Sequence, residues 1–222
     1  MTSSEFRDKL ARRARRAKAP LTLAMLDPLE TYFRLLVQWN AKINLTSLPL
    51  EEPTDETFDR LLIEPLAAAG KVENNSTLWL DLGSGGGSPA IPLKIAKPSL
   101  KLAMVESKER KAAFLREAIR ALHLGETVVE NSRFEDVALD VRYAGLARMV
   151  TVRAVKTDST LFDASRALLG DSGRLLMFRP SHAASPDPPE FARVDTVQLT
   201  DAHPASAYLS IYRRVFHVEQ SR

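Results

Sequence analysis

The chain has 222 residues, of which 45% are hydrophobic and 27% charged, a composition typical of a soluble globular protein. It contains no cysteine, which excludes disulfides, thiolate metal ligands and a cysteine nucleophile. No apolar run approaches the roughly 20 residues of a membrane span, and the charged N-terminus lacks the apolar core of an export signal. The four histidines match no ligand spacing. We therefore expect a cytoplasmic monomer with no metal and no membrane association.

Basic residues are concentrated in the first 18 residues, which we call the N-terminal arm, although the net charge of the whole chain is only +3. Such a cluster suits a polyanion, because each neutralised phosphate releases a counterion. The arm also carries a weak apolar stripe that includes Phe6 and Leu10, so the charges could simply be the solvated face of a helix, and the arm alone slightly favours this second interpretation. The basic residues are Arg7, Lys9, Arg12, Arg13, Arg15, Arg16 and Lys18.

Residues 1–75 are predicted to form an N-terminal helical region. Asp27-Pro28-Leu29-Glu30 combines a cap, a proline at the first helical position and a reciprocal acid, so we expect a helix to start there. A second helix is expected from about Asp55 to Ala69, with Pro65 able to kink it. Between the two, the segment 40–47 interrupts the helical pattern, and its apolar side chains are expected to pack this region onto the rest of the protein.

Residues 76–222 are predicted to form a doubly wound, Rossmann-like α/β domain, because strand and helix patterns alternate along them. Two β-rich stretches at about 193–199 and 207–216 have no helix pattern between them, so we expect an antiparallel pair at the edge of the sheet. The five strands expected before that pair lie at 78–80, 102–105, 127–129, 149–152 and 175–178.

A glycine-rich loop follows the first predicted strand, in Leu80-Asp81-Leu82-Gly83-Ser84-Gly85-Gly86-Gly87. Glycine lets the backbone turn tightly and approach a ligand, and the next helix offers free N–H groups. Glu106 ends the second strand, where an acid can accept both hydroxyls of an adenosyl ribose. The pattern reads D-x-G-x-G-x-G with serine at Ser88, unlike a dinucleotide loop, and Asp81 would hold water or an ammonium group and repel a pyrophosphate. This combination predicts a methyltransferase that uses S-adenosylmethionine.

The sequence also limits the methyl acceptor. Covalent catalysis at pyrimidine C5 needs a cysteine, which the chain lacks, and no Asn/Asp-Pro-Pro-aromatic element for exocyclic amines follows the fourth strand. A ring nitrogen such as guanine N7 presents a lone pair and needs no deprotonation. These observations permit guanine N7 as the acceptor without selecting it.

Several segments together resemble one family, the bacterial 16S rRNA guanine-N7 methyltransferase G family (RsmG), also called glucose-inhibited division protein B. The resemblance covers roughly residues 29–180. It rests on five segments: Trp39-Asn40 with Lys42-Ile43-Asn44-Leu45-Thr46, Gly83 to Leu93, Glu106-Ser107 with Arg110-Lys111 and Phe114-Leu115, Ser132-Arg133-Phe134-Glu135, and Arg153-Ala154-Val155.

The resemblance implies site residues as well as a fold, that of a class I methyltransferase with an N-terminal helical extension. Phe134 and Glu135 would hold the adenine side of the cofactor, and Arg153 would close the site near its methionine end or the target base. Arg153 and Arg179 are the implied catalytic residues. The predicted cofactor-binding residues are Asp81, Gly83, Ser84, Gly85, Gly87, Ser88, Glu106, Ser107, Phe134, Glu135 and Arg153.

The chain departs from the family pattern at three places. The family's R-H-I-L-D-S becomes Arg60-Leu61-Leu62-Ile63-Glu64-Pro65, without the histidine, and Ala90 replaces a glycine. Arg179-Pro180 stands where the family has Lys-Gly. These changes lie close to the expected pocket and bear on the RNA target and on activity.

The sequence therefore predicts methyl transfer to guanine N7 in 16S rRNA, with the rRNA or the small ribosomal subunit as partner. Two alternatives remain open. One is a methyltransferase for another RNA, a protein or a small molecule, and the other is a non-catalytic RNA- or ribosome-binding module that kept the fold. A dehydrogenase is a distant third, because fold alone does not fix function.

Overall fold

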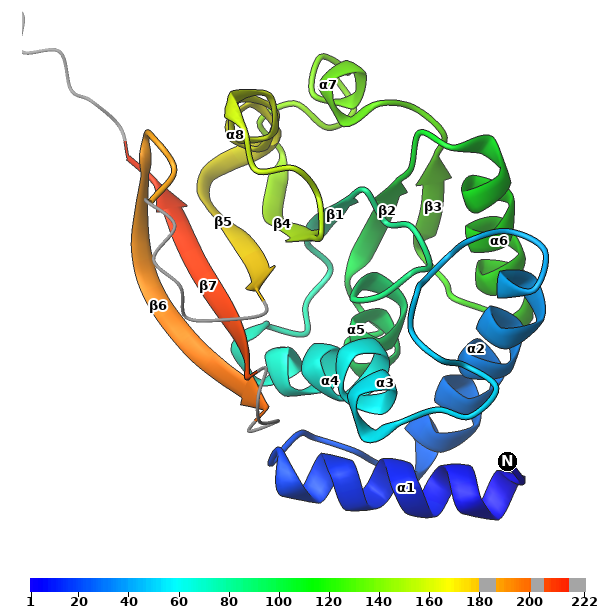
Figure 1. Ribbon diagram of the computed structural model, residues 1–222. Coiled ribbons are helices and arrows are strands. Elements are labelled where there is room, and N and C mark those ends of the chain that lie inside the picture. The colour runs from blue at the N-terminus through cyan, green and yellow to red at the C-terminus, as the bar shows by residue number, and fades with distance from the viewer. Residues whose placement is uncertain (180–186, 201–205, 216–222) are drawn as a thin grey trace, which may run out of the picture.

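The computed structural model describes residues 1–179, 187–200 and 206–215. Seven strands form one sheet in the order β3-β2-β1-β4-β5-β7-β6 (Figure 1). The first five strands are parallel to one another, and β7 pairs antiparallel with both β5 and β6. This confirms the predicted α/β sheet with an antiparallel pair at its edge. The strands are β1 (Leu78–Leu82), β2 (Lys101–Val105), β3 (Thr127–Glu130), β4 (Ala147–Arg153), β5 (Leu169–Arg179), β6 (Phe191–Thr200) and β7 (Ala207–Arg214).

Helices cover both faces of the sheet (Figure 1). Because side chains alternate along a strand, Trp79 of β1 belongs to one hydrophobic cluster and its neighbour Leu80 to the other. The Trp79 cluster includes side chains of the N-terminal helices, α5 and α6, and the Leu80 cluster those of α7 and α8. The helices are α1 (Ser3–Arg16), α2 (Leu23–Asn40), α3 (Asp55–Phe58), η1 (Asp59–Ile63), α4 (Glu64–Ala68), η2 (Ala69–Lys71), α5 (Ala90–Ala96), α6 (Glu109–Ala121), α7 (Phe134–Val137) and α8 (Ser159–Leu168).

The strand order reverses at the centre of the sheet, between β1 and β4. From β1 the chain builds outward to β2 and β3, and it then returns to place β4 on the other side of β1. The crossover connections diverge at such a point and leave a crevice at the carboxyl ends of the strands, where ligands of doubly wound folds bind. The glycine-rich loop leaves β1 at this position.

The helix predicted to start at Pro28 begins five residues earlier, at Leu23, so that prediction was wrong. Pro28 lies inside α2, where it lacks the N–H that would bond to the carbonyl of Ala24. The extra turn packs Met25 and Leu26 against the core. Apolar burial thus extends the helix past a local start signal that looked complete.

The helix expected from about Asp55 to Ala69 is present as one helical segment with a change of winding in its middle. It runs through α3, the π-helical turn η1, α4 and the short 3-10 turn η2. The π turn ends directly before Glu64-Pro65. Proline explains the change, because its ring clashes with the carbonyl four residues earlier and it cannot donate a hydrogen bond to it.

The N-terminal helices and the sheet share one hydrophobic core. Phe6 of α1, Phe33 of α2 and Phe58 of α3 form an aromatic cluster with ring centroids 5.2–5.6 Å apart. These rings belong to the same buried cluster as Trp79 of the sheet. The boundary expected near residue 75 falls in the connection between η2 and β1, and the division of the chain into two units at that point stays a prediction.

Candidate active site

The glycine-rich loop turns sharply between β1 and α5 because three of its glycines, Gly83, Gly85 and Gly87, adopt backbone angles that other residues avoid. Gly83 has φ +72°, and a Cβ there would lie 2.6 Å from Cγ2 of Val155. Gly87 has φ +84°, and a Cβ there would lie 2.5 Å from Cδ1 of Ile91. The amides of Gly83 and Ser84 both donate to the carbonyl of Val105, which ties the loop to the end of β2. The loop therefore makes the tight turn that its glycines predict.

Asp81 lies directly beneath this loop and is 1% exposed. Its Oδ1 accepts a hydrogen bond from the hydroxyl of Thr151, and Ser84 donates its hydroxyl to the Asp81 carbonyl. Its Oδ2 is buried and has no hydrogen-bond partner among the described residues. Burial raises the pKa of the Asp81 carboxyl to about 6. A buried carboxylate with one oxygen unpaired is suited to a cationic ligand.

Glu106 joins the loop to the end of β2. Its Oε2 accepts from the amide of Gly85 at 2.9 Å, and its Oε1 accepts from the amide of Lys108 at 2.8 Å. Each carboxylate oxygen has two acceptor positions, so both retain capacity for a further donor. The side chain is therefore held in place and can still accept the two hydroxyls of a ribose, as its position predicted.

Two carbonyl groups released by the π turn hold the other side of the loop. The Leu61 carbonyl, which Pro65 cannot bond, accepts the hydroxyl of Ser88 at 2.9 Å. The Glu64 amide bonds to Asp59 rather than to Arg60, and the freed Arg60 carbonyl accepts from Nη1 of Arg153. Arg153 also donates to the Ser88 hydroxyl at 3.1 Å. Pro65 thus explains why this helical segment, Ser88 and Arg153 meet.

Arg153 forms a buried ion pair with Glu64. Their Nη2 and Oε2 atoms are 2.5 Å apart, and their side chains are 10% and 3% exposed. Burial raises the pKa of the Glu64 carboxyl, and the Arg153 charge opposes that shift. The Arg153 guanidinium also lies 4.6 Å from the ring centroid of Phe178. Because arginine keeps its proton in proteins, Arg153 can supply charge and hydrogen bonds here but cannot act as a base.

Two clefts open on either side of the loop and meet at Gly83 and Ala154. The smaller has a volume of about 380 Å³ and is lined by Glu106, Ser107, Phe134 and Glu135 among others. The larger has a volume of about 590 Å³, and its lining includes Ser84, Gly85, Ser88 and Arg153. The residues predicted for the adenosine part therefore line the smaller cleft, whereas Arg153 lines the larger cleft and Asp81 lines neither.

The structure does not bring all predicted site residues together. Gly87 faces Ile91 and lines neither cleft, so its part is to shape the turn. Arg179 lies at the end of β5 with its guanidinium 6.0 Å from the ring centroid of Tyr212, and it also lines neither cleft. Arg153 and Arg179 belong to opposite faces of the sheet. Pro180, the other departure at that place, lies outside the described residues.

Three residues at the site were missed by sequence reasoning. Tyr32 of α2 donates its hydroxyl to the Gly86 carbonyl at 2.7 Å, and burial raises its pKa. Glu64 stands where the family pattern has an aspartate, and only the fold shows that it pairs with Arg153. Thr151 is one residue in a buried strand, and only its register opposite Asp81 reveals its contact. A side-chain hydroxyl within a run of apolar strand residues is the signal that could have found it.

The segment from Asn40 to Ser47 packs and hydrogen-bonds locally, as expected for its apolar residues. The Asn40 side chain accepts from the amides of Leu45 and Thr46 at 2.9 and 3.0 Å. The Trp39 ring packs edge-on against Phe114 of α6 at 5.8 Å. The segment also contributes Asn44 and Thr46 to the lining of the larger cleft.

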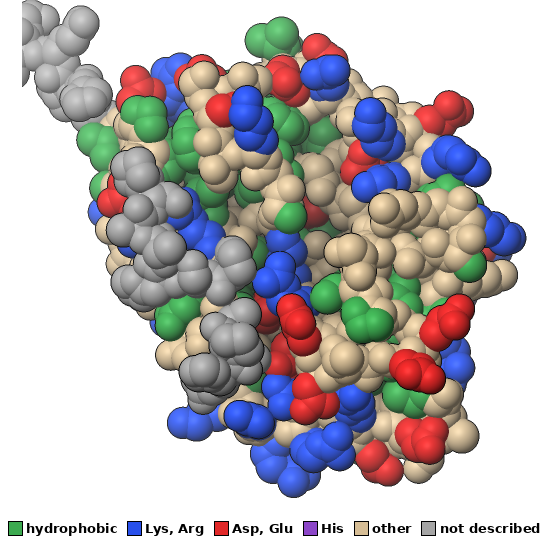
Figure 2. Space-filling view, viewed as in Figure 1, with side chains coloured by type: hydrophobic (Ala, Val, Ile, Leu, Met, Phe, Trp, Pro, Cys, Tyr) green, Lys and Arg blue, Asp and Glu red, His purple; other side chains and the backbone are tan. Residues whose placement is uncertain are grey.

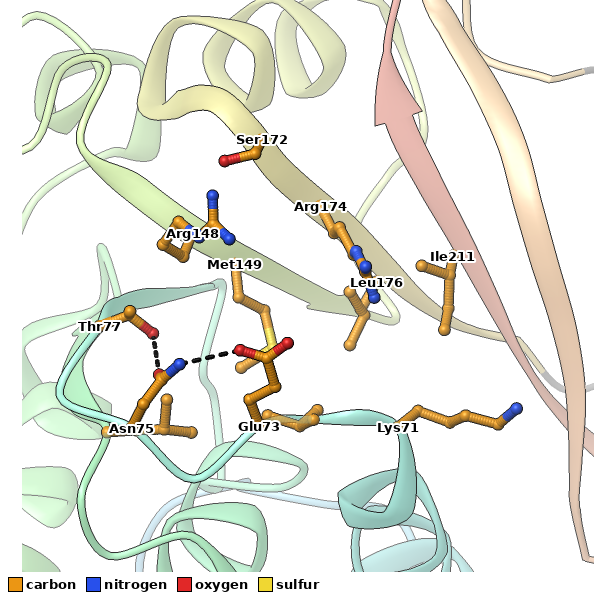
Figure 3. A pocket seen from close by; sticks show the side chains of 12 residues that line it. Lys71, Glu73, Asn75, Thr77, Arg148, Met149, Ser172, Arg174, Leu176 and Ile211 are labelled. Atoms are coloured by element: carbon orange, nitrogen blue, oxygen red, sulfur yellow. Dashed lines mark hydrogen bonds between the residues drawn. The ribbon is translucent and has the colours of Figure 1, made fainter.

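A third pocket, of about 60 Å³, lies toward the amino ends of β1 and β4, away from the glycine-rich loop (Figure 3). Arg148 and Arg174 reach it from β4 and β5, and Asn75 hydrogen-bonds to both Glu73 and Thr77. It contains none of the predicted site residues. Among the described residues, no group of three histidine or acidic side chains could hold a metal ion, and no helix could span a membrane.

The site residues fit S-adenosylmethionine on four observations. The unpaired Oδ2 of Asp81 matches an ammonium group, and Glu106 keeps acceptor capacity for ribose hydroxyls. Gly83 leaves backbone exposed where the two clefts meet. Phe134 presents an aromatic ring to the smaller cleft, where an adenine could stack.

Two solved structures show the fold in other proteins. A methyltransferase from Aquifex aeolicus, described as SAM-dependent, aligns with a TM-score of 0.52 and 11% identity over 68% of this chain and 89% of that chain. The protein MtNAS, solved in complex with MTA and tNA, aligns with a TM-score of 0.59 and 13% identity over 97% of this chain and 90% of its own. The fold is that of the class I S-adenosylmethionine-dependent methyltransferases.

The sequence comparisons give the family. The model of the family described as rRNA small subunit methyltransferase G matches residues 25–187. A relative of that name from Xanthomonas axonopodis pv. citri is 38% identical over 161 residues, 72% of this chain and 71% of the relative. Another, from Streptococcus sanguinis, is 32% identical over 185 residues, 82% of this chain and 75% of the relative. This chain belongs to the rRNA small subunit methyltransferase G family.

Proposed function

We propose that this protein transfers a methyl group from S-adenosylmethionine to N7 of a guanine in the RNA of the small ribosomal subunit. The observation that carries the proposal is the pair of buried acids, Asp81 and Glu106, around one glycine loop in a chain of this family. Glu106 would hold the ribose, and Asp81 the ammonium group. Phe134 and Glu135 would enclose the adenine.

Methyl transfer to a ring nitrogen requires little acid–base catalysis by the protein. The bound cofactor supplies a methyl group activated by a sulfonium, and the protein positions the acceptor in line with it. Guanine N7 holds a lone pair, so no proton leaves that atom before attack. Arg153 cannot act as a base, and its place in the larger cleft suits orientation of the loop or of the target base.

The target guanine must be exposed in a loop or splayed out of its stack. In a regular RNA helix the N7 edge faces a deep, narrow groove that side chains cannot enter. Arg60, Lys111 and Arg153 contribute positive charge to the lining of the larger cleft, with Glu56 as an acid there. That charge would favour an RNA segment at the cleft.

The N-terminal arm supports RNA binding with only part of its charge. Arg7, Lys9 and Arg13 pair with Asp27, Asp55 and other acids within the protein. The other arm cations are exposed, and no ion pair involves them among the described residues. Lys and Arg side chains gather where α1 lies, at the bottom of Figure 2. We assign the RNA footprint of the arm to this outer set: Arg12, Arg15, Arg16 and Lys18.

Calorimetric titration with S-adenosylmethionine tests the cofactor assignment. We expect the parent protein to bind and Glu106→Ala to weaken binding about tenfold or more, because the ribose loses a charged hydrogen-bond acceptor. Glu117→Ala, on the outer part of α6, is the matched control and should keep the parent affinity. A folded protein that does not bind S-adenosylmethionine would contradict the proposal and favour a non-catalytic RNA-binding module.

A further inference from the structure

Three buried polar side chains form a hydrogen-bonded chain that ends at Asp81. Nε1 of Trp79 donates to Oγ1 of Thr151 at 2.8 Å, and Thr151 donates to Oδ1 of Asp81. The exposed fractions of Trp79, Thr151 and Asp81 are 0%, 0% and 1%. Thr151 is the register partner of Asp81 across β1 and β4, and Trp79 shares a face of β1 with Asp81 because it lies two residues earlier.

The direction of this chain is fixed by the chemistry of its members. An indole N–H can only donate, and a hydroxyl has a single proton. When Trp79 donates to the Thr151 oxygen, the Thr151 proton is available for one acceptor, and Asp81 is that acceptor. Oδ1 therefore accepts one hydrogen bond, whereas Oδ2 accepts none from the described residues.

We propose that Thr151, held by Trp79, is a positioning residue that keeps Oδ2 of Asp81 available to the ammonium group of S-adenosylmethionine, directly or through one water molecule. The proposal rests on the proposed function, because it requires that cofactor. Asp81 itself lines neither cleft, but its backbone carbonyl accepts a hydrogen bond from Ser84, which lines the larger cleft. Without Thr151 the carboxylate would be free to rotate or to take up a proton.

The charges around Asp81 determine how binding responds to pH. Arg153 of β4 favours the ionised carboxylate, and Glu106 of β2 opposes it. Tyr32 of α2 also faces this group. Burial dominates and raises the Asp81 pKa to about 6, and hydrogen bonds from Thr151 and then Ser84 work against that rise. Because a protonated carboxyl does not attract an ammonium group, cofactor affinity should fall as the pH drops through about 6, and loss of Thr151 should move that midpoint upward.

The test is the Kd for S-adenosylmethionine, measured by calorimetry from about pH 5 to about pH 8. For Thr151→Val, which removes the hydroxyl but keeps the shape, we expect Kd at neutral pH to rise about tenfold and the midpoint to move up by about one pH unit. Thr151→Ser keeps the hydroxyl and should retain the parent values. Ser165→Ala is the matched control, since it removes another buried hydroxyl, which bonds only to the Leu161 carbonyl within α8.

A folded Thr151→Val variant with the parent Kd and midpoint would overturn the proposal. If that variant does not fold, Trp79→Phe replaces it, because loss of the indole donor releases the Thr151 hydroxyl to turn away. A weaker affinity with an upward midpoint shift supports the proposal, and unchanged values overturn it. Parent protein that binds no S-adenosylmethionine at any pH would overturn the proposed function as well, so the two failures are distinguishable.

Discussion

Asp81 is a charged side chain at a position where folding alone favours a neutral one. Its ordinary pKa of 3.8 is raised to about 6 by burial. Because the folded state holds the proton more tightly than the unfolded state, the free energy of unfolding decreases as pH rises between these two values. An acid that weakens the fold at neutral pH is characteristic of a site that binds a ligand.

Replacement of Asp81 by Asn separates these two roles. Asparagine stays neutral, so the free energy of unfolding of Asp81→Asn relative to the parent should increase by about 2.5 kcal/mol from about pH 4 to about pH 7. Over the same range the affinity of Asp81→Asn for S-adenosylmethionine should fall relative to the parent, because only the parent gains a charged carboxylate as the pH rises. Urea unfolding at several pH values measures the first effect. A difference in stability that does not change with pH would contradict this account of Asp81.

The ion pair of Glu64 with Arg153 illustrates how much one buried partner matters. Glu64→Ala leaves the Arg153 guanidinium buried without a carboxylate, and we expect a loss of about 3–5 kcal/mol in the free energy of unfolding. The exposed pair of Arg120 and Glu117 is the control, since Glu117→Ala should cost less than about 1 kcal/mol. Urea denaturation of both variants checks the prediction. Equal losses would show that burial does not determine how much the Arg153–Glu64 pair contributes to the free energy of unfolding.

At the scale of an element, local signals predicted that helices and strands exist better than they predicted their details. Pro28 looked like a helix start, but apolar burial of Met25 and Leu26 extends α2 beyond it. Pro65 was expected to kink a helix, and the structure shows a π turn there. A proline in a sequence predicts that a backbone hydrogen bond is lost. It does not predict that Ser88 and Arg153, which are remote in sequence, donate hydrogen bonds to the carbonyls that become free.

The two prolines provide a matched test of the π turn. In Pro65→Ala the new amide can bond to the Leu61 carbonyl and let this segment wind as a regular helix, which would turn that carbonyl away from Ser88, and we expect affinity for S-adenosylmethionine to decrease severalfold. Pro28→Ala likewise restores an amide inside a helix, but away from both clefts, and should leave affinity unchanged. Calorimetry on both variants compares them directly. Equal affinities would mean that the released carbonyl does not support the loop.

At the scale of the whole molecule, alternation of strands and helices was enough to predict the sheet, and the glycine loop predicted where two clefts lie. The sequence could not predict the contacts made between elements. Tyr32 meets Gly86 only because α2 packs beside the loop, and Arg179 turns away from Arg153 because β4 and β5 place them on opposite faces. Only the fold shows that the basic residues of the arm form two sets, an inner set paired with acids and an outer set exposed to solvent.

The outer arm charges predict a specific salt dependence of RNA binding. In Arg15→Gln/Arg16→Gln two phosphate contacts are lost, so the slope of log K against log salt should become shallower by about 1.5 units. Arg148→Gln/Arg174→Gln removes the same charge at the third pocket, which these two residues line, and should leave the slope unchanged. Filter binding of small-subunit RNA over a range of salt concentrations measures both. Parallel slopes for the two variants would contradict a role for the arm.

The most direct test of the central claim is nucleoside analysis of small ribosomal subunits after reaction with this protein. The subunits come from a bacterial strain without an enzyme of this family, and the methyl group of S-adenosylmethionine carries an isotope label. We predict that the label appears in 7-methylguanosine and is lost with Glu106→Ala. Label in another nucleoside, or none from a protein that binds S-adenosylmethionine, would contradict the claim that this cleft methylates guanine N7.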